Sequence, residues 1–283
     1  MLSPYMLRKS TNVAGSTLAI ASLLLALIPL GALLFYVLAQ GGSSLNLEFF
    51  TSLPKPAGES GGGMRNAIVG TLLLIPLASA VGLPIGILSG IYLARAGNAP
   101  FPQAVRFVSD VIAGTPSIVA GVVVYAVVVL PFGFSALAGG IALGLLMFPT
   151  VTRATEEAIK LVPTAIREAG LALGLPEWAT MFRIILPTAA NGIVTAIMLG
   201  IARVTGETAP LYLTIFGNPN LPRSPMDKSS ALPLQIWNYA TSPYDDWHRQ
   251  AWAGAFVLFA IVVLLNLSAR LLTYRLSRRV GSS

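Results

Sequence analysis

Long apolar stretches without a charged residue dominate the chain. Three of them cover residues 13–39, 66–94 and 111–152. A transmembrane helix needs about 20 predominantly apolar residues, so the first two stretches predict one span each. The third is long enough, at about 1.5 Å per residue, to cross a hydrocarbon core of about 30 Å twice. The tripeptide Pro131-Phe132-Gly133 near its middle is the expected turn between the two crossings.

Two further apolar stretches complete the pattern. One covers residues 188–216 and is interrupted by Arg203 and Glu207, and the other covers residues 251–270. The sequence therefore predicts one transmembrane domain over residues 1–283, in an all-α polytopic membrane protein with six transmembrane helices. The expected spans are about 13–39, 66–94, 111–130, 134–152, 188–216 and 251–270, with a polar segment at 153–187.

The first stretch could belong to a signal peptide, because Arg8 and Lys9 precede it. The apolar part of a signal peptide has only roughly 7–15 residues, which is fewer than the stretch at 13–39 contains. More apolar stretches also follow it. We therefore expect an uncleaved first span.

Composition excludes several kinds of site. The chain is 55% hydrophobic and 10% charged, whereas soluble domains carry roughly 25% charged residues. Cysteine is absent and His248 is the single histidine, so disulfides, thiolate metal sites and the usual histidine clusters or triads are excluded. No Gly-Lys-Ser/Thr follows Gly61-Gly62-Gly63, so there is no Walker A motif. We expect no enzyme, no metal and no cofactor in this chain.

The formal net charge of +7 could suggest nucleic acid, but in a membrane protein it is better explained by loop residues that set orientation. Six spans place both termini on one side of the bilayer. With that side in the cytoplasm, twelve Arg and Lys residues are cytoplasmic and five are outside, as the positive-inside rule requires. The twelve are Arg8, Lys9, Arg95, Arg106, Arg153, Lys160, Arg167, Arg183, Arg270, Arg275, Arg278 and Arg279, and the five are Lys55, Arg65, Arg223, Lys228 and Arg249.

Aromatic residues gather late in the second outer loop, residues 217–250, and directly after it. Such a cluster is typical of an interfacial belt, and contact with an extracytoplasmic partner is the alternative. Its members are Trp237, Tyr239, Tyr244, Trp247 and Trp252.

The polar segment at 153–187 is unusual in so apolar a chain. It holds eight charged residues: Arg153, Glu156, Glu157, Lys160, Arg167, Glu168, Glu177 and Arg183. A short helix over 165–173 is expected to stop at Gly174, and a second helix is expected over 177–186. Helices too short to span and too polar for lipid are suited to lie across the membrane face and enter a partner's groove. An ordinary linker is the alternative.

The segment resembles a signature of bacterial ABC importer permeases, which is Glu-Ala-Ala, three residues, Gly, nine residues, then Ile-x-Leu-Pro. This chain departs from it at Gly170, where the signature has Ala. The resemblance implies a type I ABC importer permease fold. It also implies that the segment is a coupling helix that docks in a cleft of an ATPase subunit, where ATP and Mg²⁺ would bind. The coupling residues it implies are Glu168, Ala169, Gly170, Gly174, Leu186 and Pro187.

Arg203 and Glu207 are candidates for the substrate pathway. They are four residues apart, so we expect them on one face of a helix inside the bilayer. Charges there are costly and mark a transport pathway by default. The guanidinium group of Arg203 suits a tetrahedral oxyanion, with Glu207 holding it in place and offsetting its charge. A self-contained ion pair that fixes helix packing is the alternative.

Residues 201–211 are similar to the fifth span of phosphate-specific importer permeases, and residues 113–121 and 153–163 also resemble that family. The resemblance implies that Arg203 and Arg153 take part in phosphate passage. The implied partners are a second permease chain, two ATPase subunits and an extracytoplasmic phosphate-binding protein. The sequence leaves open whether the second permease is another copy or a related chain. An importer of another oxyanion or small solute, and a secondary transporter without an ATPase, are the rival hypotheses.

Other polar residues of the candidate path have simpler explanations as well. Arg153 at a cytoplasmic helix end could be a headgroup anchor. Asp110 is expected to cap a helix start. Thr115 and Ser117 could line the path where Pro116 frees a carbonyl group, or could form bonds within or between helices.

Overall fold

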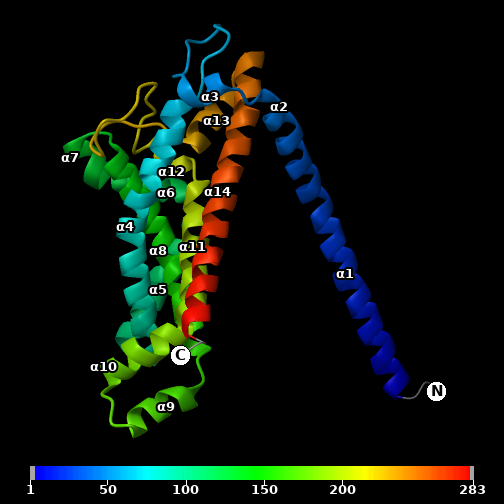
Figure 1. Cartoon of the computed structure of the whole chain (residues 1–283), viewed down its shortest axis with the longest axis vertical. Coiled ribbons are helices and arrows are strands. Elements are labelled where there is room, and N and C mark those ends of the chain that lie inside the picture. Colours follow the sequence, from blue (N-terminus) through cyan, green and yellow to red (C-terminus); the bar gives the residue numbers. More distant parts are fainter. Residues whose placement is uncertain (1–3, 98, 281–283) are drawn as a thin grey trace.

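The computed structural model describes residues 4–97 and 99–280, and helices make up almost all of its regular structure (Figure 1). Over these residues the only bridge of β type joins Phe216 and Ser229. Five helices are long and apolar enough to cross a membrane, and a bent pair of helices adds a sixth span if the pair is counted as one. The all-α membrane architecture expected from the sequence is confirmed.

The first helix stands apart from the rest of the molecule (Figure 1). α1 (Pro4–Tyr36) continues through the π-helical segment η1 (Val37–Gly41) into α2 (Gly42–Ser44). The apolar residues of α1 are exposed along nearly its whole length. In the described part of the chain it joins the bundle through η1, where Gly41 lies so near α14 (Asp245–Val280) that an added Cβ would come within 2.6 Å of Phe256 Cβ.

A glycine loop follows the short helix α3 (Leu47–Thr51). The N–H group of Gly61 donates to Asp246 Oδ2 at 3.1 Å, and that of Gly62 donates to Glu48 Oε1 at 2.8 Å. Both glycines have positive φ, which turns their N–H groups toward these carboxylates. The loop's N–H groups therefore bind the protein's own carboxylates.

Two long helices form the centre of the bundle, α4 (Arg65–Arg95) and α8 (Ala136–Lys160). Small residues let their backbones approach closely. A Cβ added at Gly86 of α4 would lie 2.8 Å from Val151 Cβ, and one added at Gly144 of α8 would lie 2.8 Å from Val81 Cβ. Around this contact the main core is built by buried residues of α4, α8, α11 (Leu186–Thr205) and α12 (Ala209–Tyr212). Among them are Leu74, Leu143, Met147, Val151, Val204 and Leu211.

The third span is expected over 111–130, and the chain bends sharply at this place. The chain instead forms α5 (Pro100–Gly114) and α6 (Ser117–Val124), with a bend of 104° at the break between them. Pro116 explains the break, because a proline disfavours helical geometry in the residue before it, and Thr115 is extended with ψ of 135°. The span expected over 111–130 therefore corresponds to a bent pair of helices, Pro100–Gly114 and Ser117–Phe132.

The turn into the next helix follows the expectation. α6 continues through η2 (Tyr125–Val129) and α7 (Leu130–Phe132), and Gly133 then adopts a φ of 86°. Ser135 caps α8 by accepting a hydrogen bond from the N–H of Ala138 at 3.1 Å. The turn expected at Pro131-Phe132-Gly133 is confirmed. The helix after it runs to Lys160, eight residues beyond the expected end at 152.

The polar segment agrees with the expectation in its first helix and departs from it in its second. α9 (Thr164–Ala172) lies within one residue of the expected helix, and Gly174 follows with a φ of 80°. The second expected helix, 177–186, does not end before the span. α10 (Glu177–Thr180), η3 (Met181–Ile185) and α11 (Leu186–Thr205) follow one another without a break. In η3 the N–H of Leu186 bonds five residues back, to Met181 O, so Pro187 follows where the hydrogen-bond ladder has already shifted.

The fifth span ends earlier along the chain than the expected stretch 188–216. α11 ends at Thr205, and a separate turn, α12 (Ala209–Tyr212), follows Gly206. Glycine, here Gly206, disfavours a helix interior, and Pro210 has no N–H to continue the ladder, which accounts for the end. α13 (Leu232–Ala240) and α14 (Asp245–Val280) complete the chain. In Figure 1 the start of α1, the end of α14, α9 and α10 lie at one end of the molecule, and α3 and α13 lie at the other.

Candidate functional site

Arg203 lies exposed on the last turn of α11 and reaches across to α8. Its Nη1 donates to Thr150 Oγ1 at 3.0 Å. Over residues 4–97 and 99–280, no carboxylate lies within ion-pair distance of its guanidinium group. Arg203 therefore has a positive charge and N–H donors beyond the one that binds Thr150, on a surface that an anion can reach.

Glu207 does not pair with Arg203, contrary to the expectation that both lie on one helix face. The helix ends two residues earlier, and Glu207 is half-buried in the link between α11 and α12. Spacing of four residues brings side chains together only while the helix continues. The ion pair considered as the simpler explanation of Arg203 is therefore also absent from the described part of the chain.

Arg153 lies on α8 three residues after Thr150, so it shares a face with the side chain that Arg203 contacts. Its Nη2 lies 2.6 Å from both carboxylate oxygens of Asp110, and its Nε lies 3.2 Å from Oδ1. The two side chains are 43% and 55% exposed. Asp110 lies near the end of α5, so the expectation that it caps a helix start is wrong. Arg153 thus forms an ion pair within the protein, which the alternative role as a simple headgroup anchor does not account for.

A second ion pair joins the same two helices in the interior. Glu156 of α8 is fully buried, and its Oε1 accepts from Arg106 Nε at 3.0 Å and Nη2 at 2.9 Å. Lys160 Nζ lies 2.7 Å from the same oxygen. Arg106 also donates to the backbone oxygens of Leu93 and Gly97, each at 3.0 Å, and so closes the end of α4. The network fixes α4, α5 and α8 together.

Sequence reasoning missed this network. The spacing of Glu156 and Lys160, four residues apart, was a signal for a contact on one helix. Nothing in the sequence connects Arg106 to Glu156, which lies fifty residues away.

Thr115 and Ser117 flank the break between α5 and α6. The hydroxyl of Thr115 donates to Val111 O at 2.6 Å, so its single O–H donor is engaged by the backbone of α5. Ser117 begins α6 and is half-buried. The structure places both residues five to seven positions beyond Asp110, at the point where the chain turns from α5 into α6.

The candidate coupling residues form two groups. Glu168 and Ala169 are exposed on α9, whereas Gly170 is buried against η3 and its neighbours. A Cβ added at Gly170 would lie 2.9 Å from both Thr180 Cγ2 and Ile184 Cδ1. The signature residues Gly170 and Ile184 are therefore in direct proximity. Leu186 is half-buried and Pro187 is exposed where α11 begins.

Glu177 ties this region together, because it bonds two arginines from different elements. Its Oε1 accepts from Arg167 Nη2 of α9 at 2.8 Å, and its Oε2 accepts from Arg95 at the end of α4. Four large apolar side chains between residues 161 and 182 remain exposed by 58% or more. They are Leu161, Leu173, Trp178 and Phe182. An apolar surface of this kind, with polar groups around it, is typical of a protein interface.

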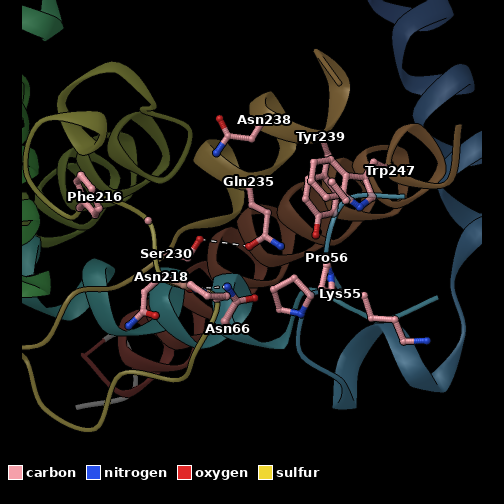
Figure 2. Close-up of a pocket in the computed structure, with 14 residues that line it drawn as sticks. Lys55, Pro56, Asn66, Phe216, Asn218, Ser230, Gln235, Asn238, Tyr239 and Trp247 are labelled. Carbon is pink, nitrogen blue, oxygen red and sulfur yellow. Dashed lines mark hydrogen bonds between the residues drawn. The ribbon is translucent and has the colours of Figure 1, made fainter. Parts of the chain in front are cut away.

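A pocket of about 600 Å³ opens at the opposite end of the molecule (Figure 2). Figure 2 shows the Tyr239 and Trp247 rings stacked on one side and Phe216 far on the other, and the two stacked rings are 4.3 Å apart. Burial raises the pKa of the Tyr239 hydroxyl above its ordinary value. Asn66 donates from Nδ2 to Asn218 O at 2.7 Å across the floor. Tyr239 and Trp247 thus pack between α13 and α14, and only part of the expected aromatic belt faces outward.

Histidine, aspartate and glutamate side chains do not gather into any group that could hold a metal ion in the described ranges. The polar chemistry of the site therefore consists of two arginines on one face of α8 and α11, a carboxylate on α5, and hydroxyl groups at Thr150, Thr115 and Ser117.

Comparison with known proteins gives a consistent result. Residues 82–282 match the family described as binding-protein-dependent transport system inner membrane component. A Yersinia pestis protein named phosphate transport system permease protein PstA is 40% identical, over 94% of this chain and 90% of that protein. The Haemophilus influenzae protein of that name is 38% identical over 93% and 94%, and a Mycobacterium tuberculosis protein named PstA 1 is 36% identical over 96% and 91%.

Solved structures show the same helical arrangement. An inward-facing MetNI methionine ABC transporter chain matches with a TM-score of 0.60 at 19% identity, over 75% of this chain and 95% of that one. A chain of a bacterial alginate ABC transporter matches with a TM-score of 0.62 at 14% identity, over 96% of both chains. At these identities the likeness concerns the fold alone.

Proposed function

The chain belongs to the family of binding-protein-dependent transport system inner membrane components, and on that premise we propose that it is the permease subunit of an ATP-driven importer that moves inorganic phosphate into the cytoplasm. The all-α permease fold expected from the sequence is confirmed by the likeness to the two ABC transporters. The chain is a permease subunit and not itself an enzyme.

Arg203 is the observation on which the phosphate proposal depends most. It is an exposed arginine inside a membrane-spanning helix, and no carboxylate neutralises it in the described residues. Guanidinium groups bind phosphate oxygens through two parallel N–H donors, so this arrangement suits an oxyanion. The relatives named as phosphate permeases match nearly the whole length of the chain and support the choice of phosphate.

The proposed path runs along the shared face of α11 and α8. Phosphate meets Arg203 and then Arg153, which lies one helical turn beyond Thr150 toward the end of α8. Thr115 and Ser117 border this face where α5 turns into α6, and Glu207 lies just beyond the outer end of α11. Alternating exposure of this face to the two sides would carry the ion across.

The partners follow from surfaces that this chain leaves uncovered. We assign α1, with its exposed apolar residues, to contact with lipid and a second, related permease chain. The exposed residues of α9 and the apolar group around it would dock on one of two ATPase subunits, where ATP and Mg²⁺ bind. The outer loops and their pocket would meet an extracytoplasmic phosphate-binding protein. The protein would then lie in the bacterial inner membrane with both termini in the cytoplasm.

Uptake by the reconstituted complex tests the proposal. Vesicles carrying the complex, with ATP inside and the binding protein and radiolabelled phosphate outside, should accumulate phosphate only when ATP is present. Arg203→Ala should abolish uptake, whereas Arg223→Ala, in the exposed outer loop, should not. No ATP-dependent uptake by the wild-type complex would refute the proposed function. Normal uptake by Arg203→Ala would refute the role of that arginine alone.

A further inference from the structure

Two arginine side chains lie at one face of α8, one from α8 itself and one from α11. Only one of them, Arg153, forms an ion pair with a carboxylate that binds its guanidinium group at hydrogen-bond distance. Arg203 contacts Thr150, and Arg153 follows three residues later, about 4.5 Å along the helix axis. Arg153 is covered by Asp110, whereas Arg203 has no acidic partner in the residues that the structure describes. Both guanidinium groups carry a positive charge, but only that of Arg153 is compensated by Asp110.

Asp110 occupies the donors of Arg153 that an oxyanion would use. Two carboxylate oxygens lie 2.6 Å from Nη2, and one of them lies 3.2 Å from Nε. Carboxylate and phosphate bind guanidinium through the same N–H groups and in the same plane. A phosphate ion and Asp110 cannot both use these donors, so binding of one at Nη2 and Nε excludes the other.

The exposure of this pair lets an incoming anion exchange with it. Arg153 is 43% exposed and Asp110 is 55% exposed, so water can solvate either group after separation. The neighbouring pair, Arg106 with Glu156, differs because Glu156 is fully buried. Since that buried pair also joins α5 to α8, α5 stays in place when Asp110 releases Arg153.

We propose that Asp110 is an internal counter-ion that occupies the Arg153 anion site, and that phosphate arriving from Arg203 must displace it to continue toward the cytoplasm. This inference rests on the proposed function. Without Asp110, Arg153 would keep only Glu156, whose Oε2 lies 3.9 Å from its Nη1 and whose charge is shared with Arg106 and Lys160. Two largely uncompensated cations would then hold a phosphate ion strongly. With Asp110, the carboxylate returns to Arg153 and promotes release of the ion.

Transport kinetics of the reconstituted complex test this role. Asp110→Asn keeps the size of the side chain and removes its charge. We expect the KM for phosphate to fall by up to about fivefold, the factor that corresponds to an exposed ion pair, and the maximal rate to fall because release slows. Glu157→Gln is the matched control: Glu157 is also exposed on α8, and it lies 3.9 Å from Lys160 instead of bonding Arg153. Its kinetics should stay near those of the wild type.

A charge exchange separates this role from a merely structural one. In the double variant Arg153→Asp with Asp110→Arg the ion pair can re-form, but the arginine has left α8. A structural pair predicts restored uptake, whereas the counter-ion role predicts lost uptake in a complex that still assembles. Restored uptake would overturn the inference, as would an Asp110→Asn complex with unchanged or raised KM, or one that does not assemble. Loss of ATP-dependent uptake in the wild-type complex would instead refute the proposed function.

Discussion

Arg106 of α5 directs Nε and Nη2 at one oxygen of Glu156 of α8, at 3.0 and 2.9 Å. Arg106 is 19% exposed and Glu156 is not exposed at all. A buried ion pair contributes little by comparison with apolar packing, but removal of one partner leaves the other charge buried without compensation. The pair is therefore a point where the fold is sensitive to a single change.

Glu156→Gln should destabilise the protein by about 3 kcal/mol, because Arg106 then remains in the interior without its carboxylate. The apparent Tm of the purified chain in detergent, followed by scanning fluorimetry, measures the effect. Asp110→Asn is the control, since it removes the exposed pair of the same two helices and should cost under about 1 kcal/mol. Equal losses of Tm in both variants would contradict the distinction between the two pairs.

Arg203→Lys keeps the positive charge but removes the planar donor pair. Loss of a charge-assisted hydrogen bond of about 1.5–3 kcal/mol corresponds to a reduction of roughly 10- to 100-fold in kcat/KM for phosphate. Thr150→Val removes only the hydroxyl that accepts from Arg203 Nη1, and its effect should stay within about fivefold. Initial rates of phosphate uptake give both values. A larger effect of the threonine change than of the lysine change would show that positioning outweighs the guanidinium group.

Some of this architecture could be predicted because it depends on local composition. Apolar stretches gave the helices that cross the membrane, and Gly133 and Gly174 mark chain reversals that require positive φ. The ends of α9 agree with the expected helix to within one residue.

The break after α5 could not be predicted with the same rules. Pro116 breaks the helix, whereas Pro76 and Pro84 lie within the unbroken α4. The tertiary contacts around these prolines also differ. Because α5 is bound to α8 through Arg106 and Asp110, it cannot align with α6. Contacts between residues forty to fifty positions apart decide the conformation here, and a single sequence contains no sign of them. The same reason explains why Asp110 was assigned to a helix cap.

Gly86→Ala should destabilise the contact between α4 and α8. An added Cβ would lie 2.8 Å from Val151 Cβ and 3.1 Å from Phe148 O, and neither atom can rotate away. Overpacking costs about 1–3 kcal/mol, which exceeds the gain of about 1 kcal/mol that alanine brings to a helix interior. Gly31→Ala on α1 is a matched control, because nothing lies within 4 Å of its Cβ position. The apparent Tm should fall for the first variant and stay level or rise for the second.

Glu168→Arg should prevent docking of the ATPase subunit while leaving the fold of the chain intact. Glu168 is exposed on α9 and forms no ion pair in the described residues, so reversal of its charge changes only the outer surface. Co-purification of the ATPase with a tagged permease measures docking. Glu59→Arg in the exposed outer loop is the control. Retention of the ATPase by Glu168→Arg would exclude this surface as the docking site.

Gly170 offers a test of the contact between α9 and η3. An alanine Cβ would come within 2.9 Å of Thr180 Cγ2 and Ile184 Cδ1, both of which are ends of side chains. Small shifts of these methyl groups can accommodate it, and alanine favours the helix by about 1 kcal/mol, so Gly170→Ala should change stability by less than about 1 kcal/mol. Gly170→Val adds two methyl groups that this space cannot take, and we expect it to separate α9 from η3. Limited proteolysis between α9 and α10 should then become faster, and ATP hydrolysis by the assembled complex should lose its coupling to phosphate uptake. Tight coupling and unchanged proteolysis in the valine variant would show that the packing of α9 on η3 does not transmit the motion of the ATPase.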